Sequence, residues 1–321
     1  GIPLYDALTA WDLSRADRPS TLQPGLALSW ESDANNRTRW IFRLRPGVTF
    51  HDGSPFNADA VVWNVRKVLD REAGHFDPRQ VGVTASRMPT LRRAEKIDDM
   101  TVALFTSEPD SLLPINLTNL FMASPAHWER LRSQHPTAEA TWNAFAATPS
   151  GTGPFRLTRF VPRERAEMTR NDNYWGEKAR AERIVLLPIP EANARTAALL
   201  SGQVDWIEAP SPDAVPQLRA RQMQIATNPQ PHVWPWQPCF LPSSPLSDVR
   251  VRRALNLAID REGLRTLLGG MMQPAVGTVP PGHPWWGNPS FNIRTDKAEA
   301  RRLLAEAGFS PQRPVTIKVQ I

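Results

Sequence analysis

The sequence predicts an α/β protein with enough chain for two domains, and three observations support this. The chain has 321 residues, of which 41% are hydrophobic, so two separate cores can form. Residues 40–50 alternate as in a half-buried strand, and residues 58–69 repeat apolar side chains at helical spacing. Residues 184–207 have the pattern of a strand, a helix and a second strand, which is typical of a parallel sheet.

Residues 40–64 are the most informative stretch. Trp40, Phe42 and Leu44 point to one face of the predicted strand, and Val48 and Phe50 continue the alternation. Pro-Gly at 46–47 and Asp-Gly at 52–53 favour tight turns. The Asn at 57 can then cap a helix.

Several further elements are predicted on either side of this stretch. They are a helix and a proline-containing loop within residues 1–30, a strand that ends at Trp30, a strand over Thr101–Thr106, helices over Ala126–Ser133 and Ala138–Ala146, and a hairpin through 155–157 and 166–168.

A strand-helix-strand unit is predicted next. Ile184–Leu187 is entirely apolar, as expected of a strand that is covered on both faces. Glu191–Ser201 is predicted to be a helix that Gly202 ends. Val204–Ile207 is predicted to be a second strand, parallel to the first.

The last third of the chain begins with a proline-rich linker at 229–246. Ser247 is predicted to cap the helix that follows, and Asp260 a second helix. Asp296 and Glu299 form a capping-box pattern for a third helix. Val315–Val319 alternates as a strand does.

Several blocks of sequence resemble one large family, the extracytoplasmic solute-binding proteins of family 5, which serve peptide and nickel ABC importers. The blocks occur in the order found in that family. They are ALSW at 27–30 with residues 40–64, SGTGPF at 150–155 with RNDNYWG at 170–176, residues 190–207, residues 247–260, PPG at 280–282, and residues 297–309.

The resemblance implies a two-lobe periplasmic-binding-protein type II architecture. It assigns residues 1–30 and 151–228 to the core of lobe I, and residues 31–150 to a lobe I subdomain of hairpins and helices. Residues 229–246 would be the interlobe linker, and residues 247–321 the start of lobe II. We therefore expect a nearly complete first lobe and a partial second lobe, with the family pattern truncated at both ends.

The resemblance also implies a function. A protein of this family captures a small solute between its lobes and delivers it to the membrane permease subunits of an ABC importer, and a di- or oligopeptide is the favoured ligand. An oligosaccharide, an opine or a metal chelate is the alternative on the same scaffold. We expect a monomer without a cofactor in the periplasm, or on the outer face of the membrane through a lipid anchor in a Gram-positive source.

A basic nucleic-acid-binding module is the alternative of another class. The net charge is +6 and the isoelectric point is about 10.1. However, Arg supplies most of the 38 basic residues and is scattered among 32 acidic residues, which favours solvated helix faces over a nucleic-acid patch. We therefore expect no nucleic-acid partner.

Motifs for catalysis are missing from the sequence. The six histidines form no H-E-x-x-H or Cys-His metal pattern, and the chain has no G-x-S-x-G, Walker or G-x-G-x-x-G motif. His51-Asp52 falls in a predicted turn. The sequence thus predicts neither an enzyme nor a metal site.

Aromatic residues are the first candidates for ligand contact. Trp234 and Trp236 lie in the linker, and Trp285 and Trp286 lie in a Gly/Pro loop, where they could stack on a ligand or cap a lobe core. By contrast, five tryptophans occupy apolar positions in the periodic pattern of predicted elements, and they are predicted to lie in a core: Trp30, Trp40, Trp63, Trp175 and Trp206. Position alone adds four residues from segments 74–80 and 119–123: Phe76, Arg79, Asn119 and Phe121.

Overall fold

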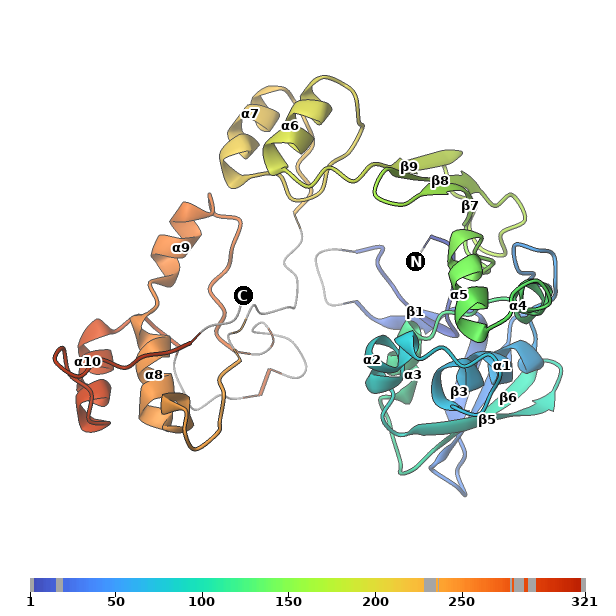
Figure 1. Ribbon diagram of the computed structural model, residues 1–321, viewed down its shortest axis with the longest axis horizontal. Coiled ribbons are helices and arrows are strands. Elements are labelled where there is room, and N and C mark those ends of the chain that lie inside the picture. Colours follow the sequence, from blue (N-terminus) through green and yellow to red (C-terminus); the bar gives the residue numbers. More distant parts are fainter. Residues whose placement is uncertain are drawn as a thin grey trace. The chain divides into compact units, whose positions relative to one another are not determined.

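The computed structural model describes residues 3–15, 20–227, 235, 237–277, 279, 286–287 and 293–318. They form two compact units (Figure 1). The first unit holds the described residues up to Pro188, and the second holds those from Ile189 onward. The mixture of strands and helices agrees with the predicted α/β class, whereas the predicted lobe boundaries stay predictions.

A four-stranded antiparallel sheet forms the centre of the first unit. Its strands in spatial order are β3 (Ala27–Ser32), β4 (Arg39–Leu44), β6 (Thr101–Thr106) and β5 (Leu91–Asp98). The predicted alternation is confirmed, because Phe42, Leu44 and Phe50 are buried. Both predicted turns contain a glycine at positive φ, Gly47 and Gly53, which agrees with their turn chemistry.

Helix α1 (Ala58–Leu69) packs against β5 and β6 and begins where predicted. The Asn57 side chain accepts a hydrogen bond from Ala60 N at 3.0 Å, and so satisfies one of the free amides of the first turn. Val61, Val65 and Val68 lie in the main core with the buried side chains of the sheet.

Short helices complete the first unit, and they include both predicted ones, as α4 and α5. They are α2 (Arg79–Val83), η1 (Ala85–Arg87), α3 (Leu113–Asn116), η2 (Leu117–Asn119), α4 (Pro125–Arg132) and α5 (Ala138–Ala147). Trp128, Trp142 and Phe145 form a second apolar cluster with Ala123, and Trp63 packs on it.

The helix predicted near the N-terminal end is wrong. Residues 3–15 contain no helix, and Thr9–Trp11 is strand β1, paired antiparallel with β2 (Leu22–Pro24). The backbone before β1 is irregular, and its groups bond to distant parts of the chain. For example, Leu26 N donates to Ala7 O at 2.9 Å. These long-range bonds satisfy backbone groups that a helix would otherwise pair locally.

The predicted strand-helix-strand unit is only partly present. The predicted hairpin forms as β7 (Phe155–Val161) and β8 (Arg165–Arg170), and β9 (Arg183–Leu186) extends it antiparallel to β8. β9 is an edge strand of this sheet, and Leu186 is 50% exposed, so the strand is not covered on both faces. Val204–Ile207 forms no strand and falls in the second unit.

Helices make up the regular structure described in the second unit. They are α6 (Ala192–Leu200), η3 (Pro212–Ala214), α7 (Val215–Ala220), η4 (Pro245–Ser247), α8 (Val249–Ala258), α9 (Arg261–Leu267) and α10 (Lys297–Glu306). Helices α8 and α10 share a small apolar cluster that includes Ala254, Leu257 and Leu303.

Most of the predicted caps in the second unit are confirmed. Asp260 accepts from Gly263 N, and Asp296 from Glu299 N, both at 2.9 Å. Ser247 is not the cap of α8, because it ends η4 and its hydroxyl donates to Ser244 O at 2.7 Å. Asp248 caps α8 instead, by accepting from Arg250 N at 2.8 Å.

Two further predictions in this unit are wrong. Residues 314–318 form no strand, and Val319 lies outside the described residues. A strand needs a neighbour with which to pair, and no described segment pairs with these residues. Trp206 is 79% exposed rather than in a core, since its segment has no sheet to pack on. The other four tryptophans predicted as core do pack on the clusters of the first unit: Trp30, Trp40, Trp63 and Trp175.

Gly153 provides a test of the packing in the first unit. A Cβ at this position would lie 2.5 Å from the carbonyl carbon of Leu4 and 2.6 Å from Pro3 O. We expect Gly153→Ala to lower the free energy of unfolding by about 1–3 kcal/mol, because backbone must move to admit the methyl group. Urea unfolding followed by tryptophan fluorescence measures this change.

Gly82→Ala is the matched control for this measurement. Gly82 lies in α2 and has nothing within 4 Å of an added Cβ. The methyl group should leave stability unchanged or raise it by up to about 1 kcal/mol, through helix propensity. Equal effects of the two substitutions would contradict the close approach at Gly153.

Candidate functional site

The tryptophans predicted to contact a ligand belong to the second half of the chain. Trp234, Trp236 and Trp285 lie outside the described residues. Trp286 is described and partly buried, and its ring lies so close to Gly277 that an added Cβ there would be 2.8 Å from Trp286 Cζ3. This contact lies within the second unit, and a role in ligand contact stays a prediction.

Phe76 lies in the segment that joins α1 to α2, and Arg79 is the first residue of α2. Phe76 is half-buried, and its amide donates to Ala73 O at 2.9 Å. The Arg79 guanidinium donates to Asp77 Oδ1 at 2.9 Å and to Asn143 Oδ1 at 3.1 Å. Arg79 is therefore held by side chains of its own unit, and Phe76 offers an apolar ring.

Asn119 and Phe121 lie where η2 ends and an irregular extended segment begins. Asn119 Oδ1 accepts from Arg87 Nη1 at 3.2 Å, and Asn119 Nδ2 donates to Asn116 O at 3.1 Å. Phe121 is half-buried, with its ring centroid 6.4 Å from that of Tyr5. The amide of Asn119 is thus engaged, whereas the ring of Phe121 is partly accessible.

Lys67 of α1 contacts both of these segments. Its carbonyl accepts from Asp77 N at 2.9 Å, and its ammonium donates to Phe121 O at 3.2 Å. The two segments chosen from sequence position are therefore brought together at one end of α1. Sequence reasoning missed Lys67, although it lies seven residues after Ala60 and three after Asn64, a spacing that places it on their face of the helix.

A half-buried carboxylate, Asp6, was also missed, and residues of two sequence motifs bond to it. Asp6 Oδ2 accepts from Thr152 Oγ1 and Trp175 Nε1, each at 2.9 Å, and Asp6 Oδ1 accepts from Tyr174 Oη at 3.2 Å. The Arg45 guanidinium lies 4.3 Å above the Trp175 ring. Burial raises the pKa of Asp6, against the effect of these hydrogen bonds. Because Thr152, Tyr174 and Trp175 all donate hydrogen bonds to Asp6, this carboxylate connects both motifs to the N-terminal segment.

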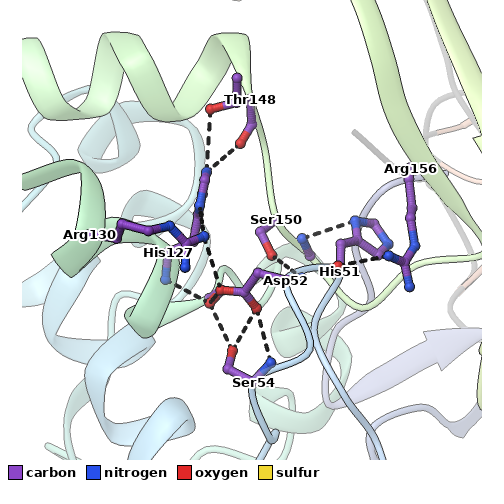
Figure 2. A network of polar contacts seen from close by, with 10 residues as sticks. His51, Asp52, Ser54, His127, Arg130, Thr148, Ser150 and Arg156 are labelled. Atoms are coloured by element: carbon purple, nitrogen blue, oxygen red, sulfur yellow. Dashed lines mark hydrogen bonds and ion pairs between the residues drawn. The ribbon is translucent and has the colours of Figure 1, made fainter.

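Figure 2 shows a second polar network, around the turn at Asp52. Asp52 Oδ1 accepts from Ser54 N at 3.2 Å and from Ser54 Oγ at 2.7 Å, and Asp52 Oδ2 accepts from Ser124 Oγ at 2.9 Å. Ser150 Oγ accepts from Asp52 N at 3.2 Å, and Arg130 Nη2 lies 3.7 Å from Asp52 Oδ2. Burial acts to raise the pKa of Asp52, but the hydrogen bonds from Ser54 and Ser124 keep it below its ordinary value.

His51 extends this network towards the start of β7. Gly151 N donates to His51 Nδ1 at 3.4 Å, so the proton lies on Nε2, which donates to Gly153 O at 2.9 Å. Arg156 Nη1 donates to His51 O at 2.8 Å (Figure 2). Burial lowers the pKa of His51 below its ordinary value of 6.5.

His127 lies on the other side of Asp52 and is held in the same tautomer. Arg130 Nη2 donates to His127 Nδ1, and His127 Nε2 donates to Thr148 O, both at 2.6 Å. Burial lowers the pKa of this ring too. The basic nitrogen of each histidine therefore already accepts a hydrogen bond, so neither ring is placed to take a proton from Ser54 or Ser124. The network joins loops and does not form a nucleophile–base pair.

No group of three or more His, Cys, Asp or Glu side chains among the described residues could hold a metal ion. No described helix is both long and apolar enough to cross a bilayer.

Comparisons with known proteins agree with the resemblance seen in the sequence. The family model for bacterial extracellular solute-binding proteins, family 5, matches residues 21–319. The chain is 27% identical to di/tripeptide-binding protein 2 of Pseudomonas aeruginosa, over 99% of this chain and 60% of that protein. It is 26% identical to the dipeptide-binding protein of Escherichia coli, over 96% of this chain and 58% of that protein.

A solved structure extends this likeness to the fold. NikA from Brucella suis, in complex with Fe(III)-EDTA, superposes with a TM-score of 0.74 and 26% identity, over 96% of this chain and 59% of that chain. This chain therefore spans about 60% of the length of the relatives that it matches.

The two histidines of the Asp52 network predict acid sensitivity. Because the folded state lowers the pKa of both rings, the unfolded state takes up protons first as the pH falls below about 6.5. The free energy of unfolding should therefore decrease from pH 7 to pH 5, and less steeply in His51→Gln/His127→Gln. Urea unfolding at several pH values measures the slope.

His135→Gln is the control for this experiment, since the side chain of His135 lies outside the network. It should keep the slope of the wild-type protein. An unchanged slope in the double variant would contradict the assignment of the acid response to His51 and His127.

Proposed function

Because the chain belongs to the bacterial extracellular solute-binding proteins of family 5, we propose that it captures a di- or oligopeptide and delivers it to an ABC importer. The observation that carries this proposal is the family match over residues 21–319, together with two relatives named for the binding of di- and tripeptides. Its partners would be the peptide and the permease subunits in the membrane. The protein would act as a monomer outside the cytoplasmic membrane, in the periplasm or held there by a lipid anchor.

The first unit supports this proposal with two partly accessible rings. Phe76 and Phe121 are half-buried, whereas the polar ends of Arg79 and Asn119 are engaged by neighbours. Apolar rings beside ordered backbone suit ligands whose side chains vary and whose backbone stays the same. This surface would therefore favour peptides over a single chemical compound.

A metal chelate is the second candidate. The similarity to NikA, solved with Fe(III)-EDTA, favours it. A chelate brings its own donors to the metal, so a chelate binder has no need of the His and carboxylate cluster that a bare metal ion would require. Fe(III)-EDTA is therefore a suitable competing probe.

Ligand identification tests the proposed function directly. We expect peptides among the small molecules released from the natively purified protein, as detected by mass spectrometry. Calorimetric titration with a library of di- and tripeptides should then give saturable binding, while Fe(III)-EDTA should give none. Binding of Fe(III)-EDTA without binding of any peptide would overturn the peptide assignment in favour of a chelate.

Phe121 is the residue of the first unit on which to test ligand contact. We expect Phe121→Ala to weaken peptide affinity about tenfold, which corresponds to about 1.4 kcal/mol and to the loss of a partly buried ring contact. Phe160→Ala is the matched control, because Phe160 is 49% exposed on β7 and lies outside both segments. Equal losses of affinity in the two variants would remove Phe121 from the site.

A further inference from the structure

Helix α1 carries two polar side chains on its buried face. Asn64 is 0% exposed and Lys67 is 6% exposed, although the valines beside them belong to the main core. Lysine is almost never buried unless it is paired, because removing its charge from water costs several kcal/mol. Both side chains must therefore have partners that compensate for burial.

Asn64 uses its whole hydrogen-bonding capacity. Asn64 Nδ2 donates to Ala60 O and to Ala123 O, each at 2.9 Å. Asn64 Oδ1 accepts from Ala123 N and from Lys67 Nζ, also at 2.9 Å. One amide side chain thus bonds both backbone groups of Ala123, as a neighbouring β-strand would do.

Lys67 adds the contact to Phe121 and the connection to the other segment. Its ammonium donates to Asn64 Oδ1 and to Phe121 O, and its carbonyl accepts from Asp77 N. Burial lowers the pKa of Lys67 to about 8, while the negative charge of Asp77 acts to raise it. The amine therefore stays largely charged at pH 7, and a charged donor makes the stronger hydrogen bond.

These contacts fix an irregular segment that has no strand beside it. Residues 120–124 are not part of a sheet, yet Phe121 O, Met122 N, Ala123 N and Ala123 O all have partners. Asn64 and Lys67 supply all of these except the bond from Met122 N to Asp6 O at 3.0 Å. The position of the Phe121 ring thus depends on two side chains of α1.

We propose that Asn64 and Lys67 are positioning residues, whose side chains hold segment 119–123 against α1 so that Phe121 meets the solute on a rigid surface. Segment 74–80 is held at the same helix by a backbone bond, from Asp77 N to Lys67 O. This proposal rests on the proposed function for its ligand. The rigidity that it requires is a property of the unliganded protein. A surface that is ordered before binding avoids the entropic cost of ordering it on binding, so loosening it should weaken affinity.

Hydrogen exchange tests the positioning without any ligand. In Lys67→Met, which keeps most of the side-chain volume, we expect amide exchange in residues 119–124 to accelerate about tenfold or more. Asn64→Leu should accelerate amide exchange at Ala123 further. If Asn64→Leu does not fold, Lys67→Met alone tests the proposal. Exchange over β6, residues 101–106, should remain unchanged in a folded variant.

Arg66→Met is the matched control on the same helix. Arg66 is exposed, and its side chain pairs with Asp70 at 2.9 Å rather than with residues 119–123. It should leave exchange in residues 119–124 at the wild-type rate. Wild-type exchange in both Lys67→Met and Asn64→Leu would overturn the proposal.

A double-mutant cycle separates positioning from general stability. If Lys67 acts through the Phe121 ring, Lys67→Met should weaken peptide affinity about tenfold in the wild-type protein and less than about twofold in the Phe121→Ala variant. If the losses of peptide affinity caused by Lys67→Met and Phe121→Ala are additive, the positioning role of Lys67 is overturned. A wild-type protein that binds no peptide would refute the proposed function instead, and the exchange rates would then decide alone whether Asn64 and Lys67 hold segment 119–123.

Discussion

The first unit depends on the close approach of the irregular segment 3–9 to three distant parts of the chain. The amides of Gly153, Met122 and Ala27 donate to carbonyls of this segment at 3.1, 3.0 and 2.9 Å. The approach is possible because glycines lie opposite it: a Cβ at Gly151 would be 2.1 Å from a carbonyl oxygen of the segment. Without these glycines, the segment could not connect the four-stranded sheet, the irregular segment 120–124 and the hairpin of β7 and β8.

This constraint gives the conspicuous sequence motifs a structural role. The glycine motif at 150–155 and the aromatic motif at 170–176 meet at Asp6, to which Thr152 and Trp175 both donate. The Arg45 guanidinium lies over the Trp175 ring. Residues that identify the family by sequence therefore hold the first unit together, and the candidate ligand surface lies in segments to which no motif draws attention.

The features that could be predicted from sequence are those that a few adjacent residues determine. The caps at Asn57, Asp260 and Asp296 are correct, because a side chain that bonds an amide three residues ahead needs no distant partner. The parallel strand pair and the burial of Trp206 were wrong, because both depend on which segments share a sheet. An apolar run such as Ile184–Leu187 fits an edge strand as well as a central one, and only tertiary pairing distinguishes them.

The choice of candidate ligand contacts in the first unit stays a prediction, but the structure shows what surrounds them. Position along the chain selected Phe76 and Phe121, but not the side chains that hold them. Replacement of a buried polar pair by apolar residues of similar volume often leaves stability unchanged or raises it, so stability alone does not explain Asn64 and Lys67. Apolar side chains could fill their space, but they could not bond the backbone of an irregular segment whose amides and carbonyls are shielded from water. Since Ala123 is only 4% exposed, its backbone must find partners within the protein, and α1 supplies them through side chains because a helix has no free backbone groups along its length.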